Sequence, residues 1–172
     1  MSEPRKTTNL DIYGNPPLEW KRAHAILSTP ASPEITQFLG TCRPDGTPHA
    51  AGVGAQWDGG FYYFTSGPAA RKARDLAANP RCTISVRLPG MDLVLTGTAA
   101  RVTDAATLER LAAAYRDGGW PCRVEGDALT APFSAPSAGP PPWHLYRLTH
   151  TSIVGVATEE PYGAARWDFE RP

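Results

Sequence analysis

The sequence predicts a mainly β protein, with antiparallel strands in a small closed or split barrel and a few helices outside it. Several short segments alternate apolar and polar residues with period two, and turn signals rich in Pro and Gly separate them. The chain has 172 residues, 41% of them hydrophobic and 20% charged, which is ordinary for a globular domain with one core.

The N-terminal part begins with a polar stretch, so residues 1–14 are expected to be flexible and residues 15–172 to form a single domain. The pair Pro16-Pro17 suits the first turn of a helix, which we expect to run from Asn15 to about Ser28. Its apolar residues recur on one face and should pack on the outside of the core: Trp20, Ala23 and Leu27.

Period-two alternation predicts strands at residues 37–43, 48–57, 61–65, 81–87, 91–102 and 144–157. Hairpin turns are expected at Pro44-Asp45-Gly46 and at Asp58-Gly59, so the first three strands form a meander. Another helix is expected between the cap Asp104 and Gly118. Its buried stripe falls at i, i+3, i+4 and i+7: Leu108, Leu111, Ala112 and Tyr115.

Residues 119–143 are rich in Pro, Gly, Ser and Ala and are interrupted by aromatic residues. This composition is typical either of a loop that wraps over the domain or closes as a lid, or of a disordered segment. The tail 162–169 carries more aromatic residues than a free tail should. We therefore expect an obligate homodimer in which residues beyond Gly119 cross to the partner.

A short basic helix is expected in the stretch 67–80, directly after an aromatic strand. Pro68 suits its first position and Gly67 or Ser66 its cap, so the N–H groups of the first turn would face an anion such as phosphate. Arg71 points away from the apolar stripe and Lys72 lies on its border; the stripe is Ala69, Ala73, Leu76 and Ala77. The alternative is a solvated basic helix without a ligand.

Charge and sequence signals exclude several classes of function. Lys plus Arg and Asp plus Glu are both 17, so the chain has no overall field for nucleic acid or an anionic membrane. The N-terminus lacks an apolar signal core and no run is long enough to span a membrane, so a cytoplasmic protein is expected. The three cysteines lack metal-ligand spacing, so they are expected to be reduced and structural, and no metal site is predicted.

Five segments in order resemble the flavin and deazaflavin oxidoreductase superfamily that includes pyridoxamine 5′-phosphate oxidase. They are Phe38–His49, Trp57–Ser66, Arg71–Leu76, Asn79–Arg81 and Leu95–Thr98. The resemblance is greatest to the branch of actinobacteria that uses a deazaflavin coenzyme. It implies an antiparallel split β-barrel of the FMN-binding-protein type that forms homodimers, with cofactor sites between the subunits.

The resemblance also implies roles for individual residues. Lys72 would contact the cofactor phosphate with Arg71 and Arg74 nearby, and Thr65 and Ser66 would hydrogen bond at the strand end. Asp75 departs from the Asn that relatives often carry there. The small residues expected along the ring system of the cofactor are Gly52, Val53, Gly54, Ala55 and Gln56.

The function implied is that of an oxidoreductase whose cofactor carries the reaction, since no catalytic side-chain motif is present. The expected cofactor is the deazaflavin coenzyme F420, which would pass a hydride to or from a small conjugated substrate. Its long acidic tail suits the several cations in this region: Arg71, Lys72, Arg74, Arg81 and Arg87. Alternatives are an FMN-dependent oxidase or reductase of the same fold, or a non-catalytic protein that binds flavin, deazaflavin or haem.

Three residues are candidates for a substrate pocket. His49 enters the second strand just before the predicted ring-binding segment, and Trp120 and Trp167 come from loops that could close a groove. Each is otherwise read as a surface, strand or core residue.

Overall fold

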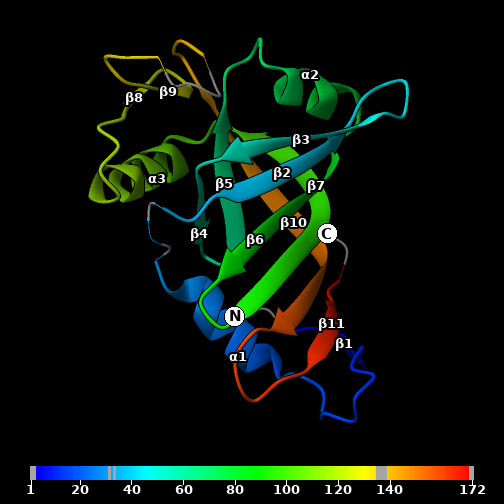
Figure 1. The fold of residues 1–172 in the computed structure, drawn as a ribbon. Coiled ribbons are helices and arrows are strands. Elements are labelled where there is room, and N and C mark those ends of the chain that lie inside the picture. The colour runs from blue at the N-terminus through cyan, green and yellow to red at the C-terminus, as the bar shows by residue number, and fades with distance from the viewer. Residues whose placement is uncertain (1–2, 31, 33, 135–138, 171–172) are drawn as a thin grey trace.

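The structure is a computed structural model that describes residues 3–30, 32, 34–134 and 139–170. It is mainly β, with three helices outside an antiparallel barrel (Figure 1). The helices are α1 (Trp20–Ser28), α2 (Arg71–Ala78) and α3 (Ala105–Asp117). The strands are β1 (Lys6–Asn9), β2 (Gln37–Cys42), β3 (Pro48–Val53), β4 (Ala55–Asp58), β5 (Phe61–Ser66), β6 (Arg81–Leu88), β7 (Met91–Val102), β8 (Arg123–Glu125), β9 (Ala128–Thr130), β10 (His144–Ala157) and β11 (Ala164–Asp168).

The barrel is closed by a bend in the chain rather than by a continuous ladder of hydrogen bonds. Around the barrel the paired strands follow the order β4, β5, β10, β7, β6, β2 and β3. β3 then leads directly into β4 through Gly54, although the two strands do not pair with each other. The sequence predicts one strand over residues 48–57. The structure divides it into two, because β3 pairs with β2 whereas β4 turns away to pair with β5.

The main core fills this barrel and continues beneath α1. Its largest fully buried side chains include Phe64 and Leu95 from the strands and Trp167 from the tail. A second, smaller core lies on the other face of β5, where α3 and the β8–β9 hairpin cover Tyr63 and Leu145 (Figure 1). Asp104 caps α3 by accepting the Thr107 N–H at 2.9 Å, which confirms the predicted cap.

The tail packs against the sheet and the core of the same chain. β11 pairs with β10 over Ser152–Val156, and Trp167 packs against Trp20 with ring centroids 5.5 Å apart. Trp143, at the end of the predicted loop 119–143, bridges to Leu129 and is fully buried. In the structure of the single chain these residues beyond Gly119 pack on the same chain, and their predicted crossing to a partner stays a prediction. Residues 135–138 of that loop lie outside the described residues.

The N-terminal segment is more ordered than the sequence predicts. Residues 1–14 carry few apolar side chains, yet Lys6–Asn9 form β1 and pair in register with β11. Backbone hydrogen bonding to an open strand edge accounts for this, and it needs no apolar pattern. α1 starts at Trp20 rather than Asn15, with Glu19 in the extended conformation at its N-cap. None of the helices among the described residues is long and apolar enough to cross a membrane.

Candidate functional site

The predicted anion-binding helix is present as α2, but it begins three residues later than the sequence indicates. Ala70 is its N-cap in the extended conformation, and Arg74 is the first residue to bond back, to the Ala70 carbonyl at 3.2 Å. The N–H groups of the first turn therefore point out of this end of the helix. The predicted apolar stripe is only half buried: Ala73 and Leu76 are buried, whereas Ala69, which precedes the helix, and Ala77 are exposed.

The cations of α2 lie on two different faces. Arg71 and Arg74 are exposed, whereas Lys72 is only 3% exposed and faces the barrel. Burial lowers the pKa of the Lys72 ammonium, because removal from water disfavours the charged form. A buried ammonium beside a helix N-terminus favours an anionic ligand at that place.

Two other cations expected here lie elsewhere. Arg81 is exposed at the start of β6, past the carboxyl end of α2. Arg87 is six residues further along β6, about 20 Å away at 3.3 Å per residue. It forms a two-point ion pair with Asp92, with distances of 2.6 and 2.7 Å. The local positive charge is therefore smaller than the sequence predicts.

The end of β5 contributes one hydroxyl that is turned inward. Thr65 is half-buried, whereas Ser66 is fully buried and its Oγ donates to the Gly67 carbonyl at 3.2 Å. The Thr65 side chain is therefore the more accessible of the two predicted phosphate contacts.

The predicted ring-binding segment alternates across the wall of the barrel. Val53 and Ala55 face the core, 7% and 6% exposed, and their short side chains offer little surface to a ligand. Gly52 and Gln56 are half-buried, and Gly54 is exposed at the bend. A Cβ added to Gly54 would meet no atom within 4 Å. This open backbone, next to small residues, is a surface that a planar ring system can approach.

Two side chains fix the bend itself. The Tyr115 hydroxyl from α3 donates to the Gly54 carbonyl at 3.0 Å. Gln37 of β2 reaches the backbone of Ala55 on the other side of the bend. The predicted ring surface is therefore held by contacts from α3 and β2.

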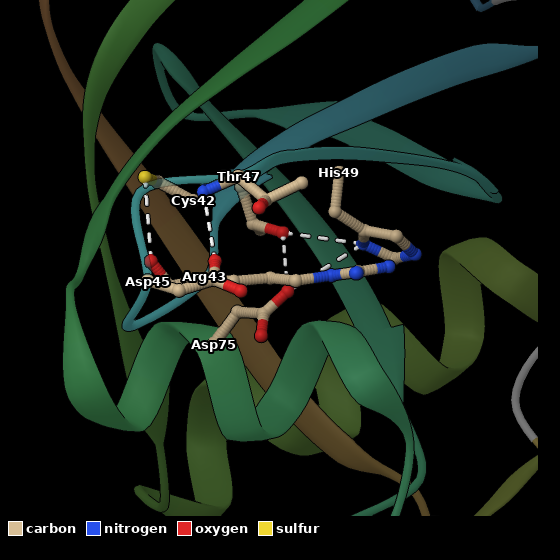
Figure 2. A network of polar contacts seen from close by, with 7 residues as sticks. Cys42, Arg43, Asp45, Thr47, His49 and Asp75 are labelled. Carbon is tan, nitrogen blue, oxygen red and sulfur yellow. Dashed lines mark hydrogen bonds and ion pairs between the residues drawn. The ribbon is translucent and has the colours of Figure 1, made fainter.

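His49 belongs to a polar cluster that the sequence does not reveal (Figure 2). Asp75 points from α2 toward β2 and β3 and is 1% exposed. Thr41 Oγ1 donates to Asp75 Oδ2 at 3.0 Å, and His49 Nδ1 lies 3.3 Å from Thr41 Oγ1 and 3.6 Å from Asp75 Oδ2. Because the Thr41 proton is directed to Asp75, the Thr41 oxygen accepts from His49, which places the imidazole proton on Nδ1.

Buried polar atoms without a protein partner mark the edge of this cluster. Among the described residues, neither Asp75 Oδ1 nor Arg43 Nε has a hydrogen-bond partner. Arg43 lies in the β2–β3 hairpin, whose turn is held by Thr47 N–H donating to Asp45 at 2.9 Å (Figure 2). The sequence marks Asp75 only as a departure from the Asn of relatives, and it does not indicate that Thr41 and His49 lie beside it.

The three substrate-pocket candidates do not come together. His49 lies beneath α2, with 22% of its side chain exposed. Trp120 is half-buried at the end of α3, with its ring 5.0 Å from Tyr115 and 5.2 Å from Trp143. Trp167 is fully buried in the main core and cannot line a pocket. Aromatic residues of a tail and of a site have the same sequence signature, so the sequence alone could not separate them.

A cavity of about 440 Å³ lies instead between α1, β4 and the end of α3. It includes two residues of the predicted ring segment, Ala55 and Gln56, and it adds Trp57 and Tyr62. Among the described residues, no group of three or more His, Cys, Asp and Glu side chains is placed to hold a metal.

Comparisons with known proteins agree with this architecture. The family model described as pyridoxamine 5′-phosphate oxidase matches residues 31–149. A comparison with curated proteins finds no match.

Solved structures with the same fold include an F420 reductase, 24% identical over 76% of this chain and 94% of that chain, with a TM-score of 0.52. A pyridoxamine 5′-phosphate oxidase-related, FMN-binding protein from Nostoc punctiforme PCC 73102 is 18% identical over 80% of this chain and 81% of that chain, with a TM-score of 0.53. General Stress Protein 26 from Bacillus anthracis str. Sterne is 15% identical over 78% of this chain and 91% of that chain, also with a TM-score of 0.53. These likenesses show the split-barrel fold.

Proposed function

Because the chain belongs to the pyridoxamine 5′-phosphate oxidase family, whose split barrels bind FMN or F420, we propose that it is an oxidoreductase that uses the deazaflavin coenzyme F420. The coenzyme would supply the hydride that is exchanged with a small conjugated organic substrate. FMN is the alternative cofactor, and a non-catalytic flavin, deazaflavin or haem carrier is the alternative function.

The observation that carries the proposal is the arrangement of α2 and the bend at Gly54 on one side of the barrel. Lys72 and the first-turn N–H groups of α2 would hold the cofactor phosphate, with Arg71, Arg74 and Thr65 around it. Gly52, Gly54 and Gln56 would lie along the ring system, where the absence of a Cβ at Gly54 leaves room for close approach.

Two exposed arginines beside one buried lysine favour F420 over FMN. FMN carries one phosphate, which Lys72 and the helix end could hold alone, whereas the acidic tail of F420 has use for Arg71 and Arg74 as well. This support is weaker than the sequence suggests, because Arg87 is already paired with Asp92.

We also propose that the protein acts as a homodimer, with the cofactor sites between subunits. The support is a row of neighbouring residues, each paired with the next across adjacent strands on the outer face of the barrel: Phe38, Ser85, Val94, Val154 and Arg166. Three of these five residues are apolar: Phe38, Val94 and Val154. Phe38 is 52% exposed and Val94 is 40% exposed, which is unusual for a face without a partner.

The test is calorimetric titration of F420 and of FMN into the purified chain at low and moderate salt. F420 should bind more tightly than FMN, and its affinity should fall more steeply with salt because more ion pairs contribute. Tight FMN binding with no F420 binding would replace the deazaflavin by FMN. Binding of neither would remove the proposal.

A further inference from the structure

The cavity between α1 and α3 has the size of a small-molecule site. Its volume is about 440 Å³, within the range of roughly 300–1,000 Å³ that is usual for ligand pockets. It is bounded by the carboxyl ends of α1 and α3, by β4 and by Leu88. Both helices contact β4, so the cavity is built into the packing of the domain.

One wall is an aromatic ring that is held in place from several sides. Trp57 lines the cavity and contacts Tyr62 edge-to-face, with ring centroids 5.3 Å apart at 73°. It stacks on the buried His150 at 6.0 Å and 24°, and it meets the edge of His24 from α1 at 6.3 Å. A fixed indole wall suits a flat conjugated ring, because stacking then costs little side-chain entropy.

The electrostatics of this cavity are opposite to those of α2. Asp117 is the one charged side chain among the described residues that line it. No cation in the described part of the chain lies within 4.0 Å of that carboxylate. The other polar groups are neutral: the Gln56 amide and the hydroxyls of Ser28 and Thr29. A phosphate or carboxylate in this cavity would face Asp117 without a counter-charge.

The distance between the cavity and α2 suits a cofactor that is bound at α2 by its phosphate and reaches the cavity with its ring. Trp57 pairs with Tyr62 at one end of the β4–β5 hairpin, and Ser66 ends β5 just before α2. Four residues of strand separate these two levels, about 13 Å at 3.3 Å per residue. A molecule held by its phosphate at α2, with its ring along Gly54 and Gln56, would present the ring edge to this cavity.

We propose that this cavity is the substrate site, and that its substrate is a flat conjugated ring compound that is neutral or positively charged rather than phosphorylated or carboxylated. That the bound compound is a substrate rests on the proposed function. Binding of the ring compound itself rests on the cavity alone and needs no cofactor.

The experiment titrates three ligands with one ring system into the cofactor-free protein by calorimetry at neutral pH: quinoline, N-methylquinolinium and quinolinesulfonate. N-methylquinolinium should bind most tightly and quinolinesulfonate most weakly. Asp117→Asn should weaken N-methylquinolinium binding about two- to fivefold at low salt and leave quinoline unchanged, because an exposed charge contributes modestly. Glu109→Gln, an exposed change on α3 away from the cavity, is the matched control.

A second variant fills the space and leaves the charge in place. Ala114 is half-buried and lines the cavity, so Ala114→Phe should abolish binding of quinoline and N-methylquinolinium alike. Quinolinesulfonate binding as tight as quinoline binding, or unchanged binding in Ala114→Phe, would overturn the inference. Titration with F420 separates the two proposals. If the quinoline compounds bind but F420 does not, the proposed function is removed and the ring-binding site remains. If F420 binds but the quinoline compounds do not, this site is removed and the proposed function remains.

Discussion

The Gln37 side chain forms with Ala55 the two backbone hydrogen bonds that a neighbouring strand would form. Its side-chain amide accepts the Ala55 N–H at 3.3 Å and donates to the Ala55 carbonyl at 3.4 Å, and Gln37 is 4% exposed. Gln37 is the first residue of β2 and Ala55 the first of β4, so this pair joins the two strands across the open seam of the barrel. The buried Gln37 amide therefore satisfies both polar groups of Ala55 and, together with the Tyr115 hydroxyl on the Gly54 carbonyl, fixes the bend at Gly54.

The first prediction concerns Gly97 and Gly54, two glycines of the barrel whose added Cβ atoms would meet crowded backbone and open space, respectively. A Cβ at Gly97 would lie 2.1 Å from the Thr149 carbonyl oxygen, next to the register shift between β7 and β10. Gly97→Ala should therefore lower the free energy of unfolding by several kcal/mol, roughly 3 or more. Gly54→Ala should leave stability within about 1 kcal/mol, because its Cβ would enter open space, and should weaken cofactor binding. Denaturant unfolding and cofactor titration of both variants check this pair, and equal stability losses would contradict it.

A second prediction concerns Lys72. Lys72→Ala should weaken cofactor binding about ten- to a hundredfold, since a charge-assisted contact to phosphate contributes about 1.5–3 kcal/mol. Arg87→Ala is the control, because Arg87 is exposed, paired with Asp92 and far along β6 from α2. Calorimetric titration with F420 measures both. Wild-type affinity in Lys72→Ala would take Lys72 out of the site.

A third prediction concerns the hydroxyl that supports the buried carboxylate of Asp75. Thr41→Val keeps the shape of the side chain but removes the donor to Asp75 Oδ2, which should cost about 1–3 kcal/mol. Thr41→Ser retains the hydroxyl and should recover most of that loss. Chemical denaturation of the two variants tests the cluster, and equal stability of both would show that the hydrogen bond contributes nothing.

The pH dependence of stability should follow His150. Burial among Trp57, Phe61 and Phe169 lowers its pKa to about 4, against about 6.5 in an unfolded chain. Between these values the unfolded state binds the proton and the folded state does not, so stability falls as pH is lowered from about 6.5 to 4, by up to about 3 kcal/mol. His150→Phe should flatten that part of the profile. Parallel profiles for variant and wild type would refute this assignment.

The fifth prediction is a dimer that depends on Phe38. Light scattering at micromolar concentration should give twice the mass of the chain, and Phe38→Glu should give a folded monomer, because it places a charge in an apolar interface. Phe133→Glu, also exposed but outside the barrel, should leave the mass unchanged. A well-folded wild-type monomer under these conditions would exclude the dimer.

The sequence predicted the parts of this fold that depend on local pattern. The strands β6 and β7, the hairpin turns and the capped helix α3 follow from alternation, turn residues and Asp104. It did not predict the break at Gly54, because both halves of the segment alternate correctly and only the choice of partner strand divides them. Such partner choices are set by long-range packing, which local pattern does not encode.

The same reason explains what the sequence missed at the candidate site. Lys72 and the small residues from Gly52 to Gln56 could be named as candidates because each belongs to one short segment. The Thr41–His49–Asp75 cluster and the cavity beside Trp57 join residues from three or more elements. The sequence makes Trp167 a candidate because its segment could close a groove, and only its packing against Trp20 shows that it belongs to the core.

The pairing of β1 with β11 has a consequence for how copies of this protein meet each other. β11 is a strand of only five residues, and β1 occupies the backbone groups along one of its sides. Removal of residues 3–9 would uncover those groups on a regular strand, which is a template for strand addition by another chain. The segment Lys6–Asn9 thus replaces β11 as the edge strand of the sheet, and because it is short and polar it is a poorer template for strand addition than β11, so a shortened chain should be less soluble.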